Sequence, residues 1–397
     1  MKASFRSILT TLIAALSVCA LVAAQGPRLP APFATPSVAN RTSIVPKPDG
    51  AELKLAAGFN ISIFADNLDR PRMMTLAPNS DIFVAQSVAG SILVLRDTNN
   101  DGMPDQRAVY AEGLQRPFGM AFQSGYLYVG EESRVVRYKY QSGDTKAQGM
   151  PERLLEVPTM GHWTRNVIFG ADGRKMYVAV GSRSNKSDGE DSRRAAINEY
   201  NPDGTGHRIF ASGIRNPVGL AWQPGTNTLW TAVNERDTLG DDLVPDYATS
   251  VKDGGFYGWP YSYIGSNPDP EQAGKMPDLV KRAIVPDILI PAHSAALGIT
   301  FYTGTQFPER YRNGAFIALH GSWNRSKPAG YKVVFVPFQN GKPSGPIEDF
   351  VAGWSLSDNP NTTWGRPVGV VVARDGSLLV SDDGGSRIWR VRYTASR

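Results

Sequence analysis

Cysteine is almost absent from this sequence, since Cys19 is the only one among 397 residues. An internal disulfide framework, a thiolate zinc site and an iron–sulfur cluster are therefore excluded. Histidine is also scarce: there are four, and no two of them have the spacing of paired metal ligands. Zinc or iron catalysis through histidine ligands is accordingly disfavoured.

Several functional motifs are missing as well. The sequence contains no Walker loop, no Rossmann glycine fingerprint and no Gly-x-Ser-x-Gly elbow, which disfavours a nicotinamide enzyme of the usual kind. The formal net charge is only +5, with 42 basic and 37 acidic residues of interspersed sign. This weak charge gives no argument for binding nucleic acid or an anionic membrane surface.

The one long apolar run lies at the N-terminus and predicts a signal peptide over residues 1–24. Lys2 and Arg6 precede the apolar stretch 8–22, and small residues at 22–24 offer a cleavage site. We therefore expect a periplasmic or secreted protein with no integral membrane segment after signal removal. Lipoprotein anchoring through Cys19 is the alternative, although Val18 is large for the position before the modified cysteine. Without the two basic residues of the signal, the net charge is +3.

What the sequence does contain favours β-structure. Glycine (40) and proline (29) are abundant, and aromatic residues make up 10% of the chain. This composition is typical of many short strands joined by turns. Residues 25–50, rich in Pro, Ala and Ser, are predicted to be a disordered lead-in to a single domain over residues 51–397.

A pattern of turn, apolar strand, polar turn and second apolar strand occurs six times in that domain. Successive copies are separated by 46, 49, 50, 79 and 72 residues, so the fourth and fifth contain insertions. Repeats of this length predict an all-β fold, a six-bladed β-propeller with four-stranded antiparallel blades. The copies are marked by these anchor residues: Arg70, Arg116, Arg165, Arg215, Ser294 and Arg366.

Ring closure predicts where the chain ends meet and where the anchors lie. Residues 59–64 should complete the blade that contains residues 387–391. The six turns that precede the inner strands should converge on one mouth of the central channel. Several arginines around one opening repel each other unless an anion or carboxylates offset their charge. The alternative is that each arginine caps backbone carbonyls of its own turn.

Candidate chemistry gathers around that mouth. His162 lies in the stretch 161–166 before the third inner strand, and an unperturbed histidine pKa suits proton abstraction near neutral pH. His320 and His293 are second and third candidates for a base. Residues 234–237 with Asp241 and Asp242 offer oxygen ligands suited to Ca²⁺, although a solvated acidic turn explains them equally well.

Five motifs occur together and in order, and their combination resembles one known family. They are His162 before an arginine and a strand, residues 215–221, Asp241-Asp242, residues 254–260 and residues 364–369. The combination is similar to the glucose/sorbosone dehydrogenase family of soluble quinoproteins, in particular its L-sorbosone dehydrogenase-like branch. The resemblance spans about residues 45–393.

The resemblance implies a six-bladed propeller that holds pyrroloquinoline quinone (PQQ) and Ca²⁺ at the channel mouth. It gives His162 the role of general base and places Arg215 against the quinone oxygens, where it stabilises developing negative charge. Glu235 and Arg236 would bind calcium through backbone carbonyls, and Asp241 and Asp242 would bind a second, structural calcium. The residues that would contact the cofactor are Arg215, Asn216, Arg366, Arg325 and Arg165.

We therefore predict a periplasmic quinoprotein oxidoreductase that oxidises an aldose, an aldosulose such as sorbosone, or a related aldehyde. Hydride would pass to PQQ, with His162 taking the proton. The partners expected are a small sugar or aldehyde substrate and an unidentified electron acceptor. The alternatives are a calcium-dependent propeller lactonase, which would need carboxylates facing the axis, and a non-catalytic propeller that binds glycans or proteins.

Overall fold

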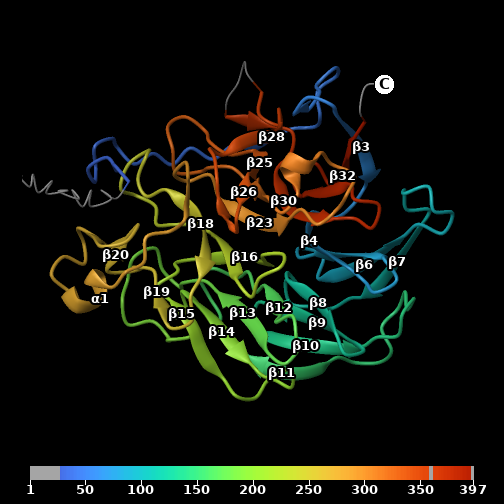
Figure 1. Ribbon diagram of the computed structural model, residues 1–397, viewed down its shortest axis with the longest axis horizontal. Helices are drawn as coiled ribbons and strands as arrows, with labels where there is room; N and C mark the ends of the chain where they lie inside the picture. The colour runs from blue at the N-terminus through green and yellow to red at the C-terminus, as the bar shows by residue number, and fades with distance from the viewer. Residues whose placement is uncertain (1–26, 357–360, 395–397) are drawn as a thin grey trace, which may run out of the picture.

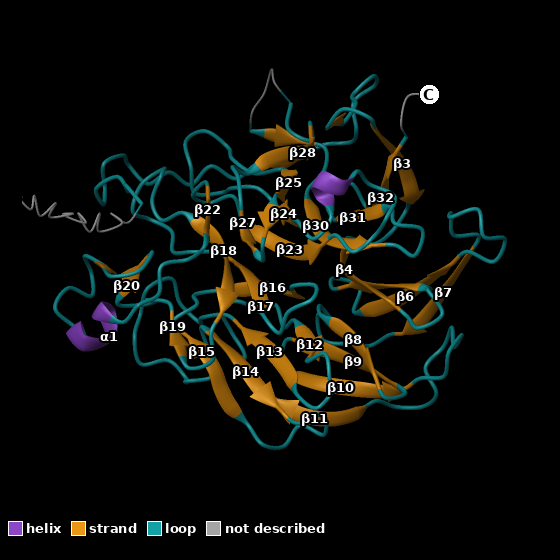
Figure 2. Cartoon of the chain, in the orientation of Figure 1, coloured by secondary structure: helices purple, strands orange, loops and turns teal. Residues whose placement is uncertain are grey.

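The structure is a computed structural model that describes residues 27–356 and 361–394. The predicted signal peptide and Cys19 lie outside these residues. The described chain is nearly all β-structure (Figure 2), and its helices are α1 (Pro277–Lys281) and the 3₁₀ turn η1 (Glu309–Tyr311). None of the helices in these two ranges is long and apolar enough to cross a membrane.

Six antiparallel sheets form the blades, which confirms the predicted six-bladed propeller. From the inner strand outward, the first blade consists of β4 (Pro71–Leu76), β5 (Ile82–Gln86), β6 (Ser91–Arg96) and β7 (Gln106–Ala111). The second consists of β8 (Met120–Gln123), β9 (Tyr126–Glu131), β10 (Arg134–Lys139) and β11 (Glu152–Glu156). The third consists of β12 (Val167–Phe169), β13 (Met176–Val180), β14 (Ala196–Tyr200) and β15 (Arg208–Ser212). The fourth blade consists of β16 (Pro217–Trp222), β17 (Leu229–Val233), β18 (Asp246–Val251) and β22 (Ile288–Ile290). The fifth consists of β23 (Ala296–Phe301), β24 (Ala315–Leu319), β25 (Lys332–Val336) and β28 (Glu348–Ala352). The sixth consists of β30 (Pro367–Val372), β31 (Leu378–Asp382), β32 (Arg387–Tyr393) and β3 (Phe59–Ala65).

The strand at the outer edge of the sixth blade comes from the other end of the chain. β3 pairs antiparallel with β32, with Ile61 opposite Val391, as predicted from the need to close the ring. The inner strands are neighbours in the order β4, β8, β12, β16, β23, β30, and β30 lies beside β4. In Figure 1 the colours accordingly run once around the molecule.

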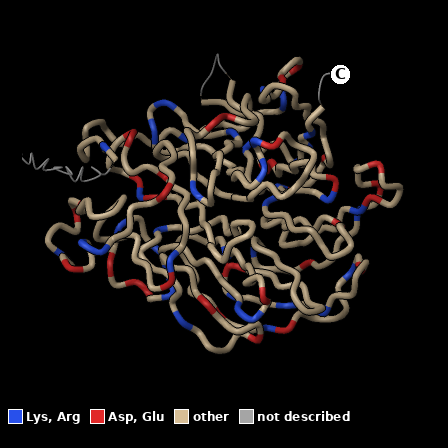
Figure 3. The backbone as a smooth tube through the Cα atoms, viewed as in Figure 1, with Lys and Arg blue, Asp and Glu red and all other residues tan. Residues whose placement is uncertain are grey.

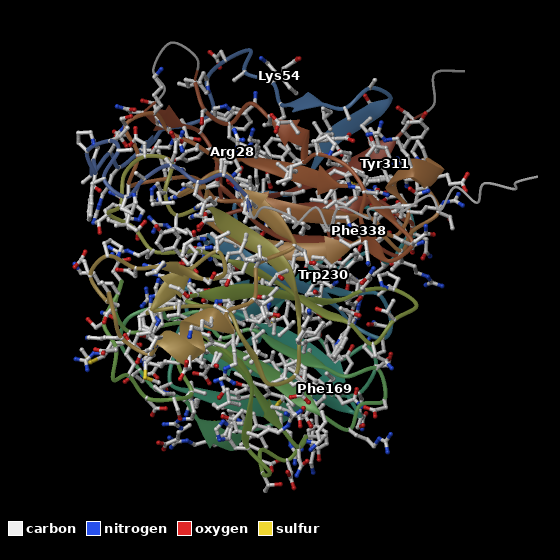
Figure 4. All side chains as sticks on the ribbon, turned by 60° about the vertical axis from the view of Figure 1, so that its left-hand side comes forward. Arg28, Lys54, Phe169, Trp230, Tyr311 and Phe338 are labelled. Carbon is white, nitrogen blue, oxygen red and sulfur yellow. The ribbon has the colours of Figure 1, made fainter. Side chains whose placement is uncertain are left out.

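The burial of each strand follows its position within the blade. β5, β13, β17, β24 and β31 are second strands, and every residue in them is buried because neighbouring blades cover both faces. Outer strands such as β7 and β11 have exposed positions. Between the fourth and fifth blades, Trp230 packs edge-on against Phe301 and Phe338, and Trp230 and Phe338 are labelled in Figure 4.

The predicted insertions add elements outside the six blades. Residues 252–287, between β18 and β22, contain β19 (Gly255–Phe256), the hairpin of β20 (Ser262–Tyr263) and β21 (Asn267–Pro268), and α1. β19 pairs with β15 in parallel and extends the third blade. The fifth blade gains the edge strand β2 (Lys54–Leu55) and the hairpin of β26 (Phe338–Gln339) and β27 (Lys342–Pro343).

The segment expected to be a disordered lead-in makes hydrogen bonds to the propeller. The Phe33 amide donates to the carbonyl of Leu239 (2.7 Å), and the Asn40 amide donates to that of Trp323 (2.7 Å). Further along, β1 (Ser43–Ile44) pairs in parallel with β29 (Thr362–Thr363). The segment therefore lies against loops of the fourth, fifth and sixth blades.

Basic and acidic residues are interspersed over the whole fold (Figure 3).

Phe59, on the closing strand β3, provides a test of ring closure. Its side chain is buried, at 7% exposed. It packs edge-on against four aromatic rings, with 4.7–5.1 Å between ring centroids: those of Phe307, Tyr311, Phe350 and Tyr393. We expect Phe59→Ala to lower the free energy of unfolding by about 3–5 kcal/mol, because it leaves a cavity among these rings.

Urea unfolding followed by tryptophan fluorescence measures this change. Phe33→Ala is the control: this side chain is 58% exposed, so the variant should differ from wild type by less than about 0.5 kcal/mol. Equal stabilities for the two variants would show that the Phe59 side chain does not stabilise the packing of β3 against the fifth blade.

Candidate active site at the mouth of the channel

A cluster of six apolar side chains, one from each blade, crosses the channel axis. The cluster consists of Met73, Phe118, Trp163, Val218, Leu297 and Val368. All six lie where the inner strands begin or just before them. Beyond the cluster, a cavity of about 570 Å³ is lined by later residues of the inner strands, including Phe169 and Trp222. The six residues therefore form a floor between that cavity and the turns at the mouth.

His162 lies in the turn that precedes β12, and Ser182 holds it in place. The backbone amide of His162 donates to the carbonyl of Ser182 (3.0 Å), and its Nδ1 lies 2.8 Å from the same oxygen and 3.1 Å from Ser182 Oγ. A carbonyl oxygen only accepts hydrogen bonds, so Nδ1 carries the hydrogen of the neutral ring. Nε2 is then left with a free lone pair, as a general base requires.

The electrostatic surroundings of His162 keep its ring neutral. Burial lowers the pKa of His162 to about 3, and the positive charge of Arg215 contributes to the same shift. The ring is therefore unprotonated at any ordinary pH. An anion placed beside Arg215 would oppose part of that lowering and make Nε2 a stronger proton acceptor.

Arg215 is held by five acceptors. Its Nε donates to the carbonyl of Asn185 (3.3 Å), Nη1 to the carbonyls of Asn234 (3.3 Å) and Glu235 (2.6 Å), and Nη2 to Asn185 Oδ1 (2.9 Å). Nη2 also pairs with a carboxylate oxygen of Asp237 at 3.3 Å. The guanidinium is therefore fixed in orientation, and Asp237 is the carboxylate that pairs with it.

Asp237 also contacts His293, which sequence analysis proposed as a base. Its Oδ1 lies 3.3 Å from His293 Nδ1, while His293 Nε2 lies 2.8 Å from the carbonyl of Gly240. Both ring nitrogens face acceptors, so both carry hydrogens. Burial alone would lower the pKa of His293, but the bonds to Asp237 and Gly240 raise it overall. His293 is therefore arranged as a cation and not as a base.

Asn185 was not identified from the sequence, although it connects several parts of the site. Besides accepting from Arg215, its carbonyl accepts from the indole N–H of Trp259 (2.9 Å), and its Oδ1 accepts from the Asp237 amide (2.9 Å). Trp259 belongs to the glycine- and aromatic-rich stretch 254–260 and is 6% exposed. Its contact with Asn185 gives this stretch a supporting position behind Arg215.

Asn216, next to Arg215, contains an unpartnered polar atom. Its Oδ1 is buried and has no hydrogen-bond partner within the described part of the chain. Such an oxygen costs about 1–3 kcal/mol when nothing donates to it. A side chain of this kind at the mouth suits a site where a bound molecule completes the hydrogen bonding.

A second polar cluster joins the sixth, fifth and first blades. Arg366 donates from Nε to the carbonyl of His320 and from Nη2 to that of Gly321, both at 3.0 Å. Asp383 pairs with Arg72 (2.5 Å) and accepts from His320 Nε2 (2.8 Å). Burial and the charge of Arg366 lower the pKa of His320 to about 4. In the first blade it is Arg72, not the expected Arg70, that joins the cluster.

Arg165, which was predicted to contact the cofactor, donates to backbone carbonyls of its own turn. It is fully buried, and its guanidinium donates to the carbonyls of His162 (2.7 Å), Thr164 (2.8 Å) and Pro158 (2.7 Å). It therefore shapes the turn that carries His162. Nearer the surface, Arg116 stacks on Trp163 with 4.4 Å between the guanidinium carbon and the ring centroid.

Glu235 and Arg236, the predicted calcium ligands, are both buried. The Glu235 carbonyl accepts from Arg215, its Oε2 accepts from the Arg236 amide (2.9 Å), and Oε1 is buried without a partner in the described ranges. Burial raises the pKa of Glu235 to about 7. The Arg236 guanidinium forms ion pairs with Asp269 and Glu271, which lie in the insertion.

The other predicted calcium ligands are bound by protein groups. Asp241 accepts hydrogen bonds from the amide (2.9 Å) and the hydroxyl of Ser326, and Asp242 pairs with Arg325 (2.6 Å). Arg325 also donates to the Asp241 carbonyl (2.9 Å), so it stabilises this loop. Residues 27–356 and 361–394 contain no group of three or more His, Cys, Asp or Glu arranged to hold a metal ion.

The fold and the mouth together define a six-bladed propeller with a neutral histidine and a fixed arginine at one end of its channel. Residues 53–253 and 274–394 match the TrAA12-like family, and the chain belongs to that family. It is 30% identical over 360 residues to an uncharacterised protein of Borreliella burgdorferi, with 86% of this chain and 91% of that protein covered.

Two further similarities involve Coprinopsis cinerea. The chain is 24% identical over 404 residues to its pyrroloquinoline quinone-dependent pyranose dehydrogenase, covering 86% of this chain but only 54% of the relative. It thus spans about half the length of that relative. The solved holo form of the PQQ domain of that dehydrogenase superposes with a TM-score of 0.75 at 21% identity, covering 87% of this chain and 98% of the domain.

The Asp383 cluster generates a prediction about stability and pH. Burial alone would raise the pKa of Asp383, but its interactions with His320 and Arg72 lower it far below the usual range. We expect Asp383→Asn to lower the free energy of unfolding at pH 7 by about 3–5 kcal/mol, because Arg72 is left buried without its partner.

The difference in the free energy of unfolding between wild type and Asp383→Asn should become smaller at low pH. An aspartate with a lowered folded-state pKa contributes stability above its unfolded pKa of about 4, and that contribution is lost as the pH falls further. Because the folded-state pKa lies far below that value, urea unfolding at pH 7, 5 and about 2 should show wild type and Asp383→Asn converging only at the lowest pH. Asp172→Asn, at an exposed pair with Arg174, is the control and should follow wild type throughout. A deficit that stays constant with pH would contradict the ion-pair explanation.

Proposed function

We propose that the protein is a PQQ-dependent oxidoreductase that oxidises an aldose, an aldosulose or a related aldehyde, with His162 as general base. The observation that carries this proposal is that a neutral His162 ring, free at Nε2, occurs at the same mouth as the fixed guanidinium of Arg215. Membership in the TrAA12-like family and similarity to a pyranose dehydrogenase named for its PQQ dependence support it.

The residues at the mouth fit a planar cofactor with several carboxylates. Arg215, Asn216 and Arg366 would hold it, since they bring two guanidinium charges and an amide from the fourth and sixth blades to the same mouth. The unpartnered Oδ1 of Asn216 supports the fit, because a donor group of a bound molecule would satisfy it. When bound, PQQ would supply a two-electron acceptor for hydride.

The chain's own residues would direct the rest of the reaction. His162 Nε2 accepts the proton of the substrate hydroxyl, that of a cyclic sugar's anomeric carbon or of an aldehyde hydrate. As that proton leaves and the carbon gives up its hydride, the C–O bond becomes a carbonyl, so the product is a lactone or a carboxylic acid. Arg215 stabilises the negative charge that develops beside it. Ser182 keeps the Nδ1 hydrogen in place during the proton transfer.

Calcium fits the described residues less well, and no step is assigned to it. Asp241 and Asp242 are engaged by Ser326 and Arg325, and the Glu235 carbonyl is engaged by Arg215. Glu235 Oε1 is a buried oxygen of this loop with no hydrogen-bond partner among the described residues. If Ca²⁺ binds there, it lies beside the guanidinium of Arg215, whose positive charge opposes it, so reconstitution with Ca²⁺ and with EDTA should be compared directly.

Periplasmic or secreted localisation is part of the proposal and rests on residues 1–24. The electron acceptor that regenerates the cofactor would then be a component of that compartment or an external quinone or dye.

The test is titration of purified apoprotein with PQQ, with and without Ca²⁺, followed by absorbance and by dye reduction with a panel of aldoses and aldehydes. We expect saturable binding and turnover with at least one sugar. His162→Gln should lower kcat by about 10²- to 10⁴-fold, because proton abstraction loses its base.

His207→Gln is the matched control. His207 lies just before β15, bonds Asn198 at 2.9 Å and stacks on Tyr200, so its replacement should leave kcat unchanged. Absence of dye reduction with every sugar and aldehyde at saturating PQQ would sink the proposed function. A wild-type kcat in His162→Gln would show that His162 is not the general base.

A further inference from the structure

We infer that Gly181 and Ser182, the two residues directly after β13, are positioning residues that set the orientation and tautomer of His162. The inference rests on the proposed function, because it concerns the residue proposed as the base. It is carried by contacts that link His162 to Arg215 and Asn216 through this pair.

The backbone of Ser182 forms hydrogen bonds with both His162 and Arg215. Its carbonyl receives the amide and Nδ1 hydrogens of His162, and its own amide donates to the carbonyl of Arg215 (2.7 Å). Its hydroxyl donates to the Ser184 carbonyl (2.6 Å), which leaves the oxygen's lone pairs directed to accept from Nδ1. Ser182 is completely buried, so this arrangement is shielded from water.

Gly181 provides the space in which His162 and Asn216 meet. A Cβ on Gly181 would lie 2.6 Å from His162 Cβ and even nearer to Asn216 Oδ1. Side-chain Cβ atoms do not approach other heavy atoms this closely, so one of the partners must move. The amide of Asn216 can rotate away, but His162 Cβ is the root of its side chain, so the backbone of the turn must shift with it.

The backbone conformation of Gly181 does not itself require glycine, because its φ is not among the positive values. Gly181→Ala therefore changes contacts without imposing a strained dihedral angle. Arg194 Nη1 donates to the Gly181 carbonyl (3.0 Å) and restrains it from moving away from His162. The added methyl group is thus directed against the His162 turn.

The test measures the His162 tautomer directly, in apoprotein labelled with ¹⁵N. Long-range ¹H–¹⁵N spectra distinguish Nδ1–H, Nε2–H and doubly protonated rings, and His162→Gln assigns the resonances among only four histidines. Wild type should show His162 as the neutral Nδ1–H form from pH 5.5 to 8. Gly181→Ala should lose that pattern and gain Nε2–H or a pH-dependent mixture, and its kcat in the loaded enzyme should fall about 10²-fold.

Gly170→Ala is the matched control within the same blade. Gly170 also lacks a positive φ, and its Cβ would have no neighbour nearer than 3.4 Å, so the spectrum and kcat should stay as in wild type. If Gly181→Ala does not fold, Ser182→Ala serves instead. It removes one acceptor of the Nδ1 hydrogen and should shift the His162 resonances and lower kcat about fivefold, the effect of one hydrogen bond.

The outcomes separate the two proposals. A Gly181→Ala protein that folds and keeps the wild-type His162 spectrum would overturn the positioning inference, and an unshifted spectrum in Ser182→Ala would overturn the part assigned to the Ser182 hydroxyl. A changed spectrum supports it even if no sugar is oxidised by wild type, in which case the proposed function alone fails.

Discussion

The constraint on which the mouth depends is the concentration of guanidinium groups at one end of a closed channel. Arg72, Arg165, Arg215 and Arg366 are all largely buried near the turns that precede inner strands, where unpaired charges are costly. The fold satisfies them mainly with backbone carbonyls. Within the described part of the chain, carboxylates pair with these arginines at two points, Asp237 beside Arg215 and Asp383 beside Arg72. Positive charge is therefore organised and only partly neutralised.

The apolar floor complements this arrangement. Phe118, Val218, Leu297 and Val368, together with Met73 and Trp163, close the axis immediately behind the charged turns. Apolar atoms below a ring of fixed donors lower the local polarity and strengthen each electrostatic interaction above them. A ligand that reaches the polar groups does so from the mouth. The same closure favours a flat molecule lying across the mouth over one that threads the channel.

The sequence was sufficient for the architecture because the repeat is a local signal. Spacing of the anchors predicted six blades, and ring closure predicted the pairing of β3 with β32 across 330 residues of chain. The fate of individual arginines could not be predicted in the same way. Arg165 turns into its own loop and Arg72 pairs with Asp383, a residue 311 positions away. Such choices depend on which blade ends are neighbours, and no sequence pattern encodes them directly.

The acidic loop illustrates the same limit at the predicted metal site. Asp241 and Asp242 have the composition of calcium ligands, but the fifth blade supplies Ser326 and Arg325 as partners. Asp237, in the neighbouring stretch, instead joins Arg215 to His293. Only three-dimensional neighbours decide whether a carboxylate meets a metal or a cation.

His162 connects the electrostatics of the mouth to its chemistry. Its neutral ring follows from burial and from the charge of Arg215, and its free Nε2 follows from the Ser182 carbonyl. These two causes act on different properties: the first sets how strongly the ring holds a proton, and the second sets which nitrogen receives it. An anionic ligand beside Arg215 changes only the first. The proposed base would then become effective when such a ligand is in place, while the direction of its free Nε2 is already fixed by the fold.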